Sequence, residues 1–403
     1  MFAFQICMLG IIATGGALVI GSPYRNAIVY GTMACLSLSY FYFFCVRKRN
    51  LSLNTAEKAL ICFITIGIMH ILLSLADANH IFGALDVYYD KSFVLRQAVY
   101  LFMLPAIILF RDELYTRKKE YLITHYGELV FWALYIFHFF YVGKAITVSA
   151  QLLLCWLALR IKSPQSWRNW LRFAAVLLTP FSKDGVSTML IFRILFAAIY
   201  LAPLHWKRTA LKGMAVGLLI TILLVSFLVP MLITDTSFIS DRNTRWRLNY
   251  WTDALNSLGN TYGLGTGYGT SYASKGFTAV TKDFYATDDY SKTERTFVLA
   301  CHNSFVSVAM RTGLPGIVAF LLFIILMLWE MLKYRTLPSK AAFFALFGAV
   351  VCIAFNVGLE SPNYLFSFVF CLGECNQEVA RVRRESRLSE NAVLSRADIS
   401  LAS

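Results

Sequence analysis

Residues able to carry out chemistry are concentrated between Arg242 and Gly316, the longest polar and glycine-rich interval of the chain. This interval contains His302, whose neutral imidazole, with an unperturbed pKa of about 6.5, is suited to take a proton from a hydroxyl group. Its arginines are suited to bind phosphate, because a guanidinium group donates two parallel hydrogen bonds to phosphate oxygens. These residue types indicate a site for a phosphate-containing ligand and a hydroxyl.

His302 is one of six histidines, and it is the one flanked by polar residues at the head of an apolar run. His138, by contrast, lies between Phe137 and Phe139. A lone histidine is more often structural than catalytic. The polar setting nevertheless favours a catalytic base, with Asn303 in a supporting role.

The composition is that of a polytopic membrane protein. Of the 403 residues, 58% are hydrophobic and only 15% are charged, against roughly 25% in soluble domains. The formal net charge of +14 would suit nucleic acid in a soluble protein, but the basic residues cluster between apolar runs, as at 47–49 and 117–119. This pattern marks the cytoplasmic face of a membrane protein and argues against nucleic acid as a partner. The nine cysteines lack zinc-ligand or disulfide spacing and are expected to be buried thiols.

A membrane-spanning helix needs about 20 apolar residues, and the sequence predicts an all-α bundle of about twelve such helices. Their limits are 2–20, 27–46, 59–76, 93–110, 121–142, 145–160, 170–181, 186–204, 213–232, 303–332, 341–358 and 364–377. The first is expected to be retained, because no basic residues precede it. The seventh is short and contains Pro180, which predicts a broken or re-entrant helix.

The distribution of Lys and Arg places both termini in the cytoplasm. The expected organisation is then nine helices over 1–233, a large periplasmic loop over 234–301, three helices over 302–377 and a basic cytoplasmic tail over 378–403.

Some cations interrupt the apolar runs. Arg193 would lie about 14 Å below Asp184 along a helix, where a charge costs at least about 2.5 kcal/mol unless it faces a polar cavity. An ion pair of Arg193 with Glu128 or Asp184 that only orients helices is the alternative. With their outward neighbours, these cations predict an external surface suited to a pyrophosphate-linked lipid. Its members are Arg96, Lys183, Arg193, Arg242, Arg245, Arg247, Arg295 and Arg311.

Two further motifs of the external loop are weak. Gly263, Gly265 and Gly267 match only part of a dinucleotide-binding fingerprint, and no βαβ unit surrounds them. A loop outside the cell also meets no nucleotide. Asp288 and Asp289 lack the neighbouring ligands of a metal site, and we expect a solvated acidic turn there.

The order of these motifs resembles the O-antigen ligase and O-antigen polymerase superfamily. The motifs are Arg247-Leu248-Asn249-Tyr250-Trp251, the glycine run, His302-Asn303-Ser304-Phe305 and Gly313-Leu314-Pro315-Gly316. The resemblance in motifs covers roughly residues 242–322, and the resemblance in topology extends over the whole chain. The resemblance implies a GT-C-like membrane glycosyltransferase that needs no metal or other cofactor and takes sugar chains from undecaprenyl pyrophosphate.

The resemblance also implies roles for individual residues. His302 would be the base, Arg247 the main pyrophosphate ligand, and Lys183, Arg193, Arg96 and Arg245 further ligands. Trp251, Asn303, Gly265 and Gly267 would support them. Which of the loop arginines reaches the phosphate stays open.

Two positions depart from the family pattern. Lys183 stands where many members have arginine, so the charge is kept but the guanidinium fork is lost. Arg311 stands where glutamate is expected, which leaves the acid partner of His302 unassigned.

We therefore expect a polymerase of O-antigen or exopolysaccharide repeat units in the bacterial inner membrane, with its active site facing the periplasm. Pyrophosphate is a good leaving group, so cations can stabilise its charge in place of a metal. One alternative is an O-antigen ligase acting on the lipid A core. A second is a lipid-linked oligosaccharide flippase, although the internal repeats of transporters are not evident. Expected partners are an undecaprenyl-pyrophosphate-linked glycan donor, a lipid-linked or lipid A core acceptor, membrane lipids and a chain-length regulator.

Overall fold

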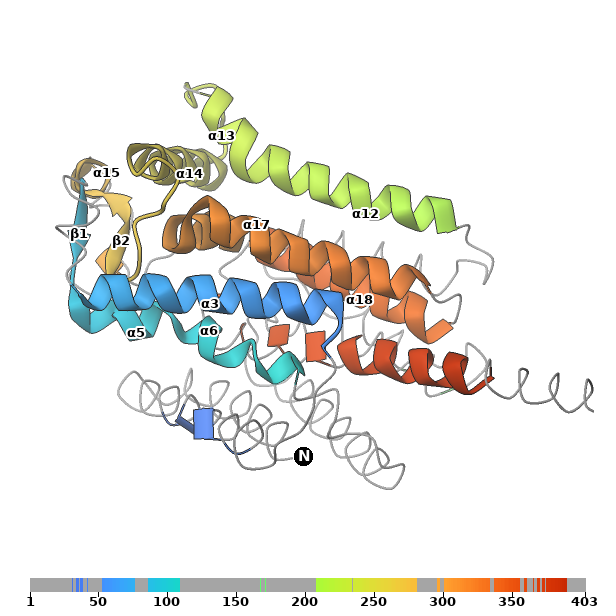
Figure 1. The fold of residues 1–403 in the computed structure, drawn as a ribbon. Coiled ribbons are helices and arrows are strands. Elements are labelled where there is room, and N and C mark those ends of the chain that lie inside the picture. Colours follow the sequence, from blue (N-terminus) through green and yellow to red (C-terminus); the bar gives the residue numbers. More distant parts are fainter. Residues whose placement is uncertain are drawn as a thin grey trace, which may run out of the picture.

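The computed structural model describes residues 53–76, 86–108, 208–233, 235–280, 296–297, 301–333, 337–355, 359–360 and 375–389, together with isolated positions within 31–42, 167–171 and 365–373. Within these residues the chain is mostly helical, and long helices run side by side (Figure 1).

Three helical segments of the described part are long and apolar enough to cross a membrane. They are α3 (Thr55–Leu75), α17 (Ser304–Lys333) and the stretch Thr209–Leu232. This last stretch comprises α12 (Arg208–Leu223), the π-helix η4 (Leu224–Leu228) and α13 (Val229–Leu232). All three agree with predicted spans, and α18 (Leu337–Ala354) packs beside α17 where another was expected. Most other predicted spans lie outside the described residues, so the total of twelve stays a prediction.

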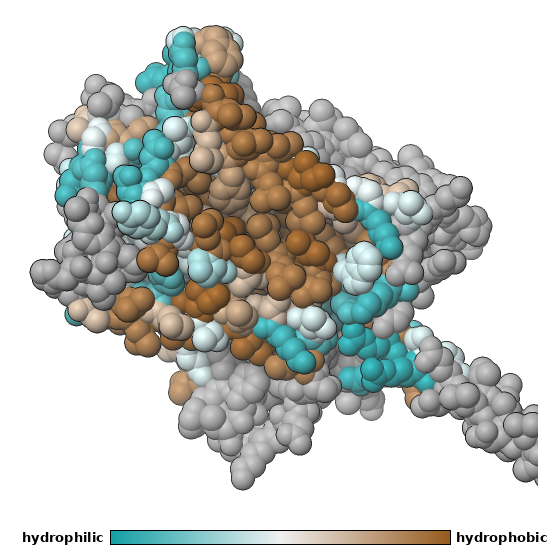
Figure 2. Space-filling model, turned by 45° about the horizontal axis from the view of Figure 1, so that its top comes forward, coloured by the Kyte–Doolittle hydropathy of each residue, from teal (hydrophilic) through white to brown (hydrophobic). Residues whose placement is uncertain are grey.

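The outward faces of these helices suit a lipid environment. Figure 2 shows a broad hydrophobic surface bordered by hydrophilic residues. Exposed apolar side chains of the described helices include Ile220 of α12, Leu224 of η4, and Val318 and Leu322 of α17. Because hydrocarbon imposes no cost on apolar side chains, such faces are expected of spans in contact with lipid.

The run predicted as one span over 93–110 is instead bent. The segments Lys91–Gln97 and Val99–Ile108 meet at 42°. The first comprises the 3₁₀-helix η2 (Lys91–Phe93) and α5 (Val94–Gln97), and α6 (Val99–Met103) follows. The buried Gln97 amide lies at this bend and contacts the loop of 234–301, where its Nε2 donates to the carbonyls of Thr270 and Phe297, each at 2.9 Å.

A small sheet corrects the expectation of an all-α fold. Strand β1 (Val87–Tyr89) pairs antiparallel with β2 (Thr270–Ser274), and Val87 lies opposite Ser274. Both segments are rich in β-branched or aromatic residues, which favour extended backbone. The pairing attaches the loop of 234–301 to the segment that leads into α5, and the short helix α15 (Lys275–Val280) follows β2.

The expected external loop contains a 19-residue helix, α14 (Arg242–Asn260), beside α13 (Figure 1). Asp241 caps its start by accepting a hydrogen bond from the Thr244 amide at 2.7 Å. The buried face of α14 includes Trp246 and Trp251, while Arg242 is exposed. Helix α14 is therefore an amphipathic helix that packs on α17 at the end where α17 begins.

Candidate active site

Arg247 and His302, the two residues predicted to be catalytic, lie close together. Arg247 projects from α14 and donates from its Nη1 atom to the Phe355 carbonyl at 3.2 Å, just beyond the end of α18. His302 lies two residues before α17 begins, and its ring meets Trp246 edge-on with 5.5 Å between centroids. Burial, followed by the positive charge of Arg247, lowers the pKa of His302 to about 4. The imidazole is therefore neutral near pH 7 and free to accept a proton.

The backbone at His302 has a left-handed conformation, with φ at 56°. Such a conformation is uncommon for a residue other than glycine and persists where surrounding contacts fix it. One such contact comes from Trp251, whose indole N–H donates to the carbonyl of Cys301 at 2.5 Å. Trp251 thus links α14 to the residue before His302, and its role in support of a catalytic base stays a prediction.

Asn303 fixes the other side of His302. Its Oδ1 atom accepts hydrogen bonds from the amides of Phe305 at 3.0 Å and Val306 at 3.2 Å, which caps α17. Its Nδ2 atom donates to the buried Ser226 hydroxyl at 2.9 Å. Ser226 lies in the π-helix η4, a type of helix defect that is common at functional sites.

A carboxyl group that the sequence analysis missed, Glu360, lies beside the start of α17. Its Oε2 atom accepts from the Ser304 hydroxyl at 2.9 Å and from the Leu359 amide at 3.1 Å. Its Oε1 atom is buried and has no hydrogen-bond partner among the described residues. Burial raises the pKa of this carboxyl. The only signal in the sequence is a lone acidic residue between the predicted spans 341–358 and 364–377.

Cys301, the cysteine nearest to His302, is a buried structural thiol. Its Sγ atom lies 3.4 Å from the Asn303 carbonyl and 3.2 Å from the Ser307 hydroxyl. Burial, with a smaller contribution from the charge of Glu360, raises the pKa of this thiol to about 12. A thiol that stays protonated is not a nucleophile.

Arg311 lies in the protein interior rather than on the expected external surface. The side chain is fully buried, and its Nη1 atom donates to the Gly267 carbonyl at 2.9 Å and to the Thr270 hydroxyl. Its guanidinium carbon lies 3.8 Å from the centroid of the Tyr272 ring. Arg311 therefore holds the segment from the glycine run to β2 against α17.

The glycine run forms a close backbone contact with α17. Gly265 has φ at 84°, and a Cβ atom there would lie 2.7 Å from the Gly313 nitrogen. The Thr266 amide donates to the Met310 carbonyl at 2.6 Å. Gly313 is itself non-helical, so the run fits into a kink of α17. Gly265 thus allows close backbone contact between the run and α17, and the supporting roles of Gly265 and Gly267 in catalysis stay predictions.

The remaining predicted phosphate ligands are placed less directly. The Nε and Nη2 atoms of Arg245 donate to the Ile239 carbonyl at 3.1 and 2.8 Å. The guanidinium of Arg96 lies 5.7 Å from the centroid of the Phe93 ring. Lys183 and Arg193 lie outside the described residues, so the phosphate-binding roles of all four stay predictions.

Metal ligands were not expected, and the described residues contain no cluster of three or more His, Cys, Asp or Glu side chains arranged for a metal ion. Asp288 and Asp289 lie outside these residues.

An apolar groove of about 350 Å³ runs between α12 and α18 toward the candidate site. Leu218 and Val225 line one wall, and Phe347 and Val351 line the other. Ser226, the partner of Asn303, also lines the groove, as does Phe355, whose carbonyl accepts from Arg247. Two residues of the groove thus contact the site, Ser226 through Asn303 and Phe355 through Arg247.

These features define a helical membrane protein with a buried polar site where α14 packs against the start of α17. Residues 173–321 match the family model described as O-antigen ligase. The match contains Arg247, the glycine run and His302, so this region of the chain is similar to the O-antigen ligase family, in agreement with the resemblance of its motifs. The similarity supports an enzyme of the glycosyltransferase type. Neither a curated protein nor a solved structure matches the chain.

Proposed function

We propose that this protein polymerises undecaprenyl-pyrophosphate-linked repeat units into O-antigen or exopolysaccharide at the periplasmic face of the inner membrane. The observation that supports this proposal best is the juxtaposition of Arg247 and His302 beside an apolar groove. A lipid-linked donor has three parts, which are a long apolar tail, a pyrophosphate and a sugar. The groove suits the apolar tail, and Arg247 suits the pyrophosphate. His302 suits the hydroxyl that attacks the sugar.

In this proposal the donor lies with its tail in the groove between α12 and α18. The hydrogen bond from Arg247 to the Phe355 carbonyl holds the guanidinium beside the groove, where it faces the pyrophosphate. Lys183 and Arg193, the further ligands that the sequence predicts, provide positive charge beside the same pyrophosphate. Charge stabilisation by fixed cations then replaces a metal ion.

His302 acts on the acceptor. It takes the proton from a sugar hydroxyl while the hydroxyl oxygen forms a bond to the anomeric carbon of the donor. The bond from that carbon to the pyrophosphate oxygen breaks, and the pyrophosphate leaves with the electron pair. The proton remains on His302 until the product departs.

Donor binding also increases the basicity of His302. In the empty site the charge of Arg247 contributes to the low pKa of the imidazole. A pyrophosphate on Arg247 offsets that charge, so the pKa of His302 rises when the donor is present. The base therefore becomes stronger at the step that needs it.

The description of the matched family favours one alternative, an O-antigen ligase that transfers the glycan to the lipid A core. Both activities use the same donor chemistry and differ in the acceptor. A deletion strain distinguishes them. A polymerase defect leaves lipopolysaccharide capped with a single repeat unit, whereas a ligase defect leaves bare core and accumulates lipid-linked polymer. The second phenotype would overturn the proposal in favour of the ligase.

A further inference from the structure

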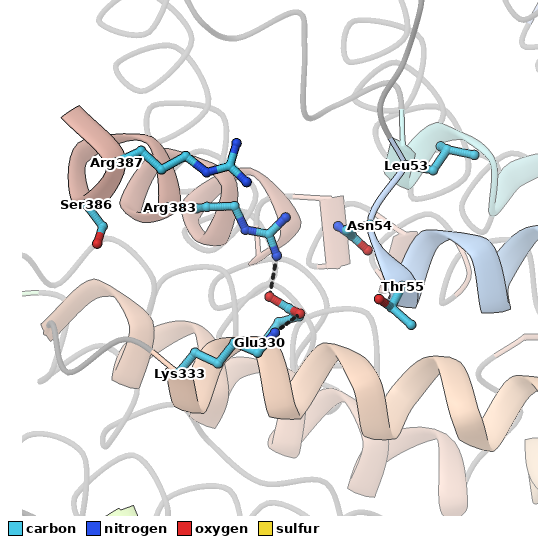
Figure 3. Close-up of a pocket in the computed structure, with 8 residues that line it drawn as sticks. All are labelled: Leu53, Asn54, Thr55, Glu330, Lys333, Arg383, Ser386 and Arg387. Carbon is cyan, nitrogen blue, oxygen red and sulfur yellow. Dashed lines mark hydrogen bonds and ion pairs between the residues drawn. The ribbon is translucent and has the colours of Figure 1, made fainter. Parts of the chain in front are cut away.

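Besides the apolar groove, a polar pocket of about 430 Å³ lies at the opposite end of α17 from His302. It is formed by the last turn of α17, the residues that begin α3, and the helix over 375–389 (Figure 3). Figure 3 shows Arg383 and Arg387 extending from one side of that helix, with Asn54 and Thr55 across the space. None of these residues belongs to the candidate active site.

The pocket has an excess of positive charge. Glu330 is 5% exposed, and its carboxylate pairs with both Lys333 and Arg383. Arg387 is a third cation in the lining, and it has no ion-pair partner among the described residues. Three cations therefore face one carboxylate, which leaves two positive charges in excess.

Glu330 fixes the positions of its partners. A buried carboxylate is costly unless cations neutralise it, so the pairing draws Lys333 and Arg383 inward. Arg383 and Arg387 are four residues apart on one helix, which puts them on the same face. The cations are consequently gathered in one cavity that three separate chain segments enclose.

The pocket lies where the candidate spans meet water. Thr55 is the first residue of the span α3, and Lys333 is the last residue of the span α17. Trp329, 44% exposed, lies one residue before Glu330, and the Nζ atom of Lys212 lies 4.6 Å from the centroid of its ring. Exposed tryptophan is typical of the membrane interface. The depth is therefore that of lipid headgroups, and the predicted topology makes this the cytoplasmic leaflet.

We propose that this pocket binds the phosphate of an anionic phospholipid headgroup. The guanidinium groups of Arg383 and Arg387 suit phosphate oxygens, and Lys333 adds a point charge. The lipid tails would follow the apolar surface of α17, where Ile325 is 38% exposed. A free phosphate shares the headgroup chemistry but lacks the tails.

Binding can be measured on the purified full chain by the rise in its melting temperature in detergent as each ligand is titrated. The probes are phosphatidylglycerol, zwitterionic phosphatidylcholine and inorganic phosphate. The test variant is Arg387→Gln, because this exposed residue does not pair with Glu330. Arg384→Gln is the matched control on the same helix, outside the pocket lining.

Phosphatidylglycerol should stabilise the wild-type chain and the Arg384→Gln control at the same concentrations. The Arg387→Gln variant, with an unchanged melting temperature in plain detergent, should need about tenfold more lipid, which corresponds to about 1.4 kcal/mol. Equal stabilisation by phosphatidylcholine, or an unaltered response of Arg387→Gln, would overturn the proposal. Stabilisation by inorganic phosphate but not by phosphatidylglycerol would show that the pocket binds free phosphate rather than a lipid headgroup. Polymerase activity is not a readout here, so a failure of this proposal is distinct from a failure of the proposed function.

Discussion

At the scale of single residues, the proposal depends on the charge of Arg247 and the basicity of His302. These two side chains come from segments 55 residues apart in the sequence, and the fold places them beside each other. Glu360 adds a buried carboxyl through Ser304, two residues after His302. Each of the three residues has a different expected response to substitution or pH.

The pH dependence of activity should report the protonation of His302. Because the pKa of His302 in the empty site is lowered to about 4, kcat/KM, which reflects free enzyme, should stay level through neutral pH and fall only near pH 4. Bound pyrophosphate raises the pKa, so kcat should begin to fall at a higher pH than kcat/KM. Steady-state rates measured across this pH range test whether kcat falls at the higher pH. If kcat and kcat/KM fall at the same pH, bound pyrophosphate does not raise the pKa of His302.

Arg247→Lys keeps the charge but removes the guanidinium fork. We expect kcat/KM to fall on the order of 10²-fold, the effect of losing one oriented donor at a developing negative charge. Arg242→Lys, at an exposed arginine of the same helix, tests the open alternative: it should retain activity, and an equal loss would give Arg242 a share in phosphate binding. Full activity of the Arg247→Lys protein would make Arg247 a structural residue.

Glu360→Ala should lower stability. The substitution removes a buried acceptor of hydrogen bonds from the Ser304 hydroxyl and the Leu359 amide, and each buried hydrogen bond contributes about 0.5 to 1.5 kcal/mol. Glu360→Gln keeps an acceptor oxygen and should retain most of the stability. Melting temperatures of the two variants in one detergent provide the comparison, and equal values for both variants would refute this role.

At the scale of elements, the kinked helix α17 and the glycine run form one unit. The glycine run occupies the kink of α17 at Gly313, and Arg311 of α17 donates a hydrogen bond to the run at the Gly267 carbonyl. Helix α14 packs on the start of α17. The loop that carries Arg247 is thus positioned by backbone contact with the helix that His302 precedes.

A methyl group at Gly265 should disrupt this unit. It would lie 2.7 Å from the Gly313 nitrogen, at a residue with φ of 84°. We expect Gly265→Ala to destabilise the protein by about 2 kcal/mol or more. Gly259→Ala is the control, since a Cβ atom there meets nothing within 4 Å. Thermal unfolding of both variants tests this, and similar melting temperatures would show that the contact is dispensable.

At the scale of the whole molecule, the sequence predicted what depends on local composition. Apolar runs of sufficient length predicted α3, α17 and α18, because hydrocarbon requires such runs. The pairing of β1 with β2 was missed, because strands of three and five residues joined across about 180 positions leave no periodic signal. Helix α14 was left inside a loop, because its polar face lowers its hydropathy below that of a span.

The site was predicted unevenly for related reasons. The order of motifs along the chain predicts roles for His302 and Arg247, and the structure places both residues at the junction of α14 and α17. Glu360 was missed because a single acidic residue between two apolar runs resembles any short loop. Arg311 was expected on the external phosphate-binding surface, because an arginine in sequence gives no sign of the carbonyl and aromatic partners that allow its burial.

The most direct test of the central claim is the distribution of glycan chain lengths made by the purified chain from undecaprenyl-pyrophosphate-linked repeat units in the presence of a chelator. The wild-type protein should extend the units into long chains without added metal. The His302→Ala protein, folded and inserted to the same extent, should leave single units. Normal chain lengths from His302→Ala, or a wild-type reaction that stops in chelator, would contradict a metal-independent transfer with His302 as its base.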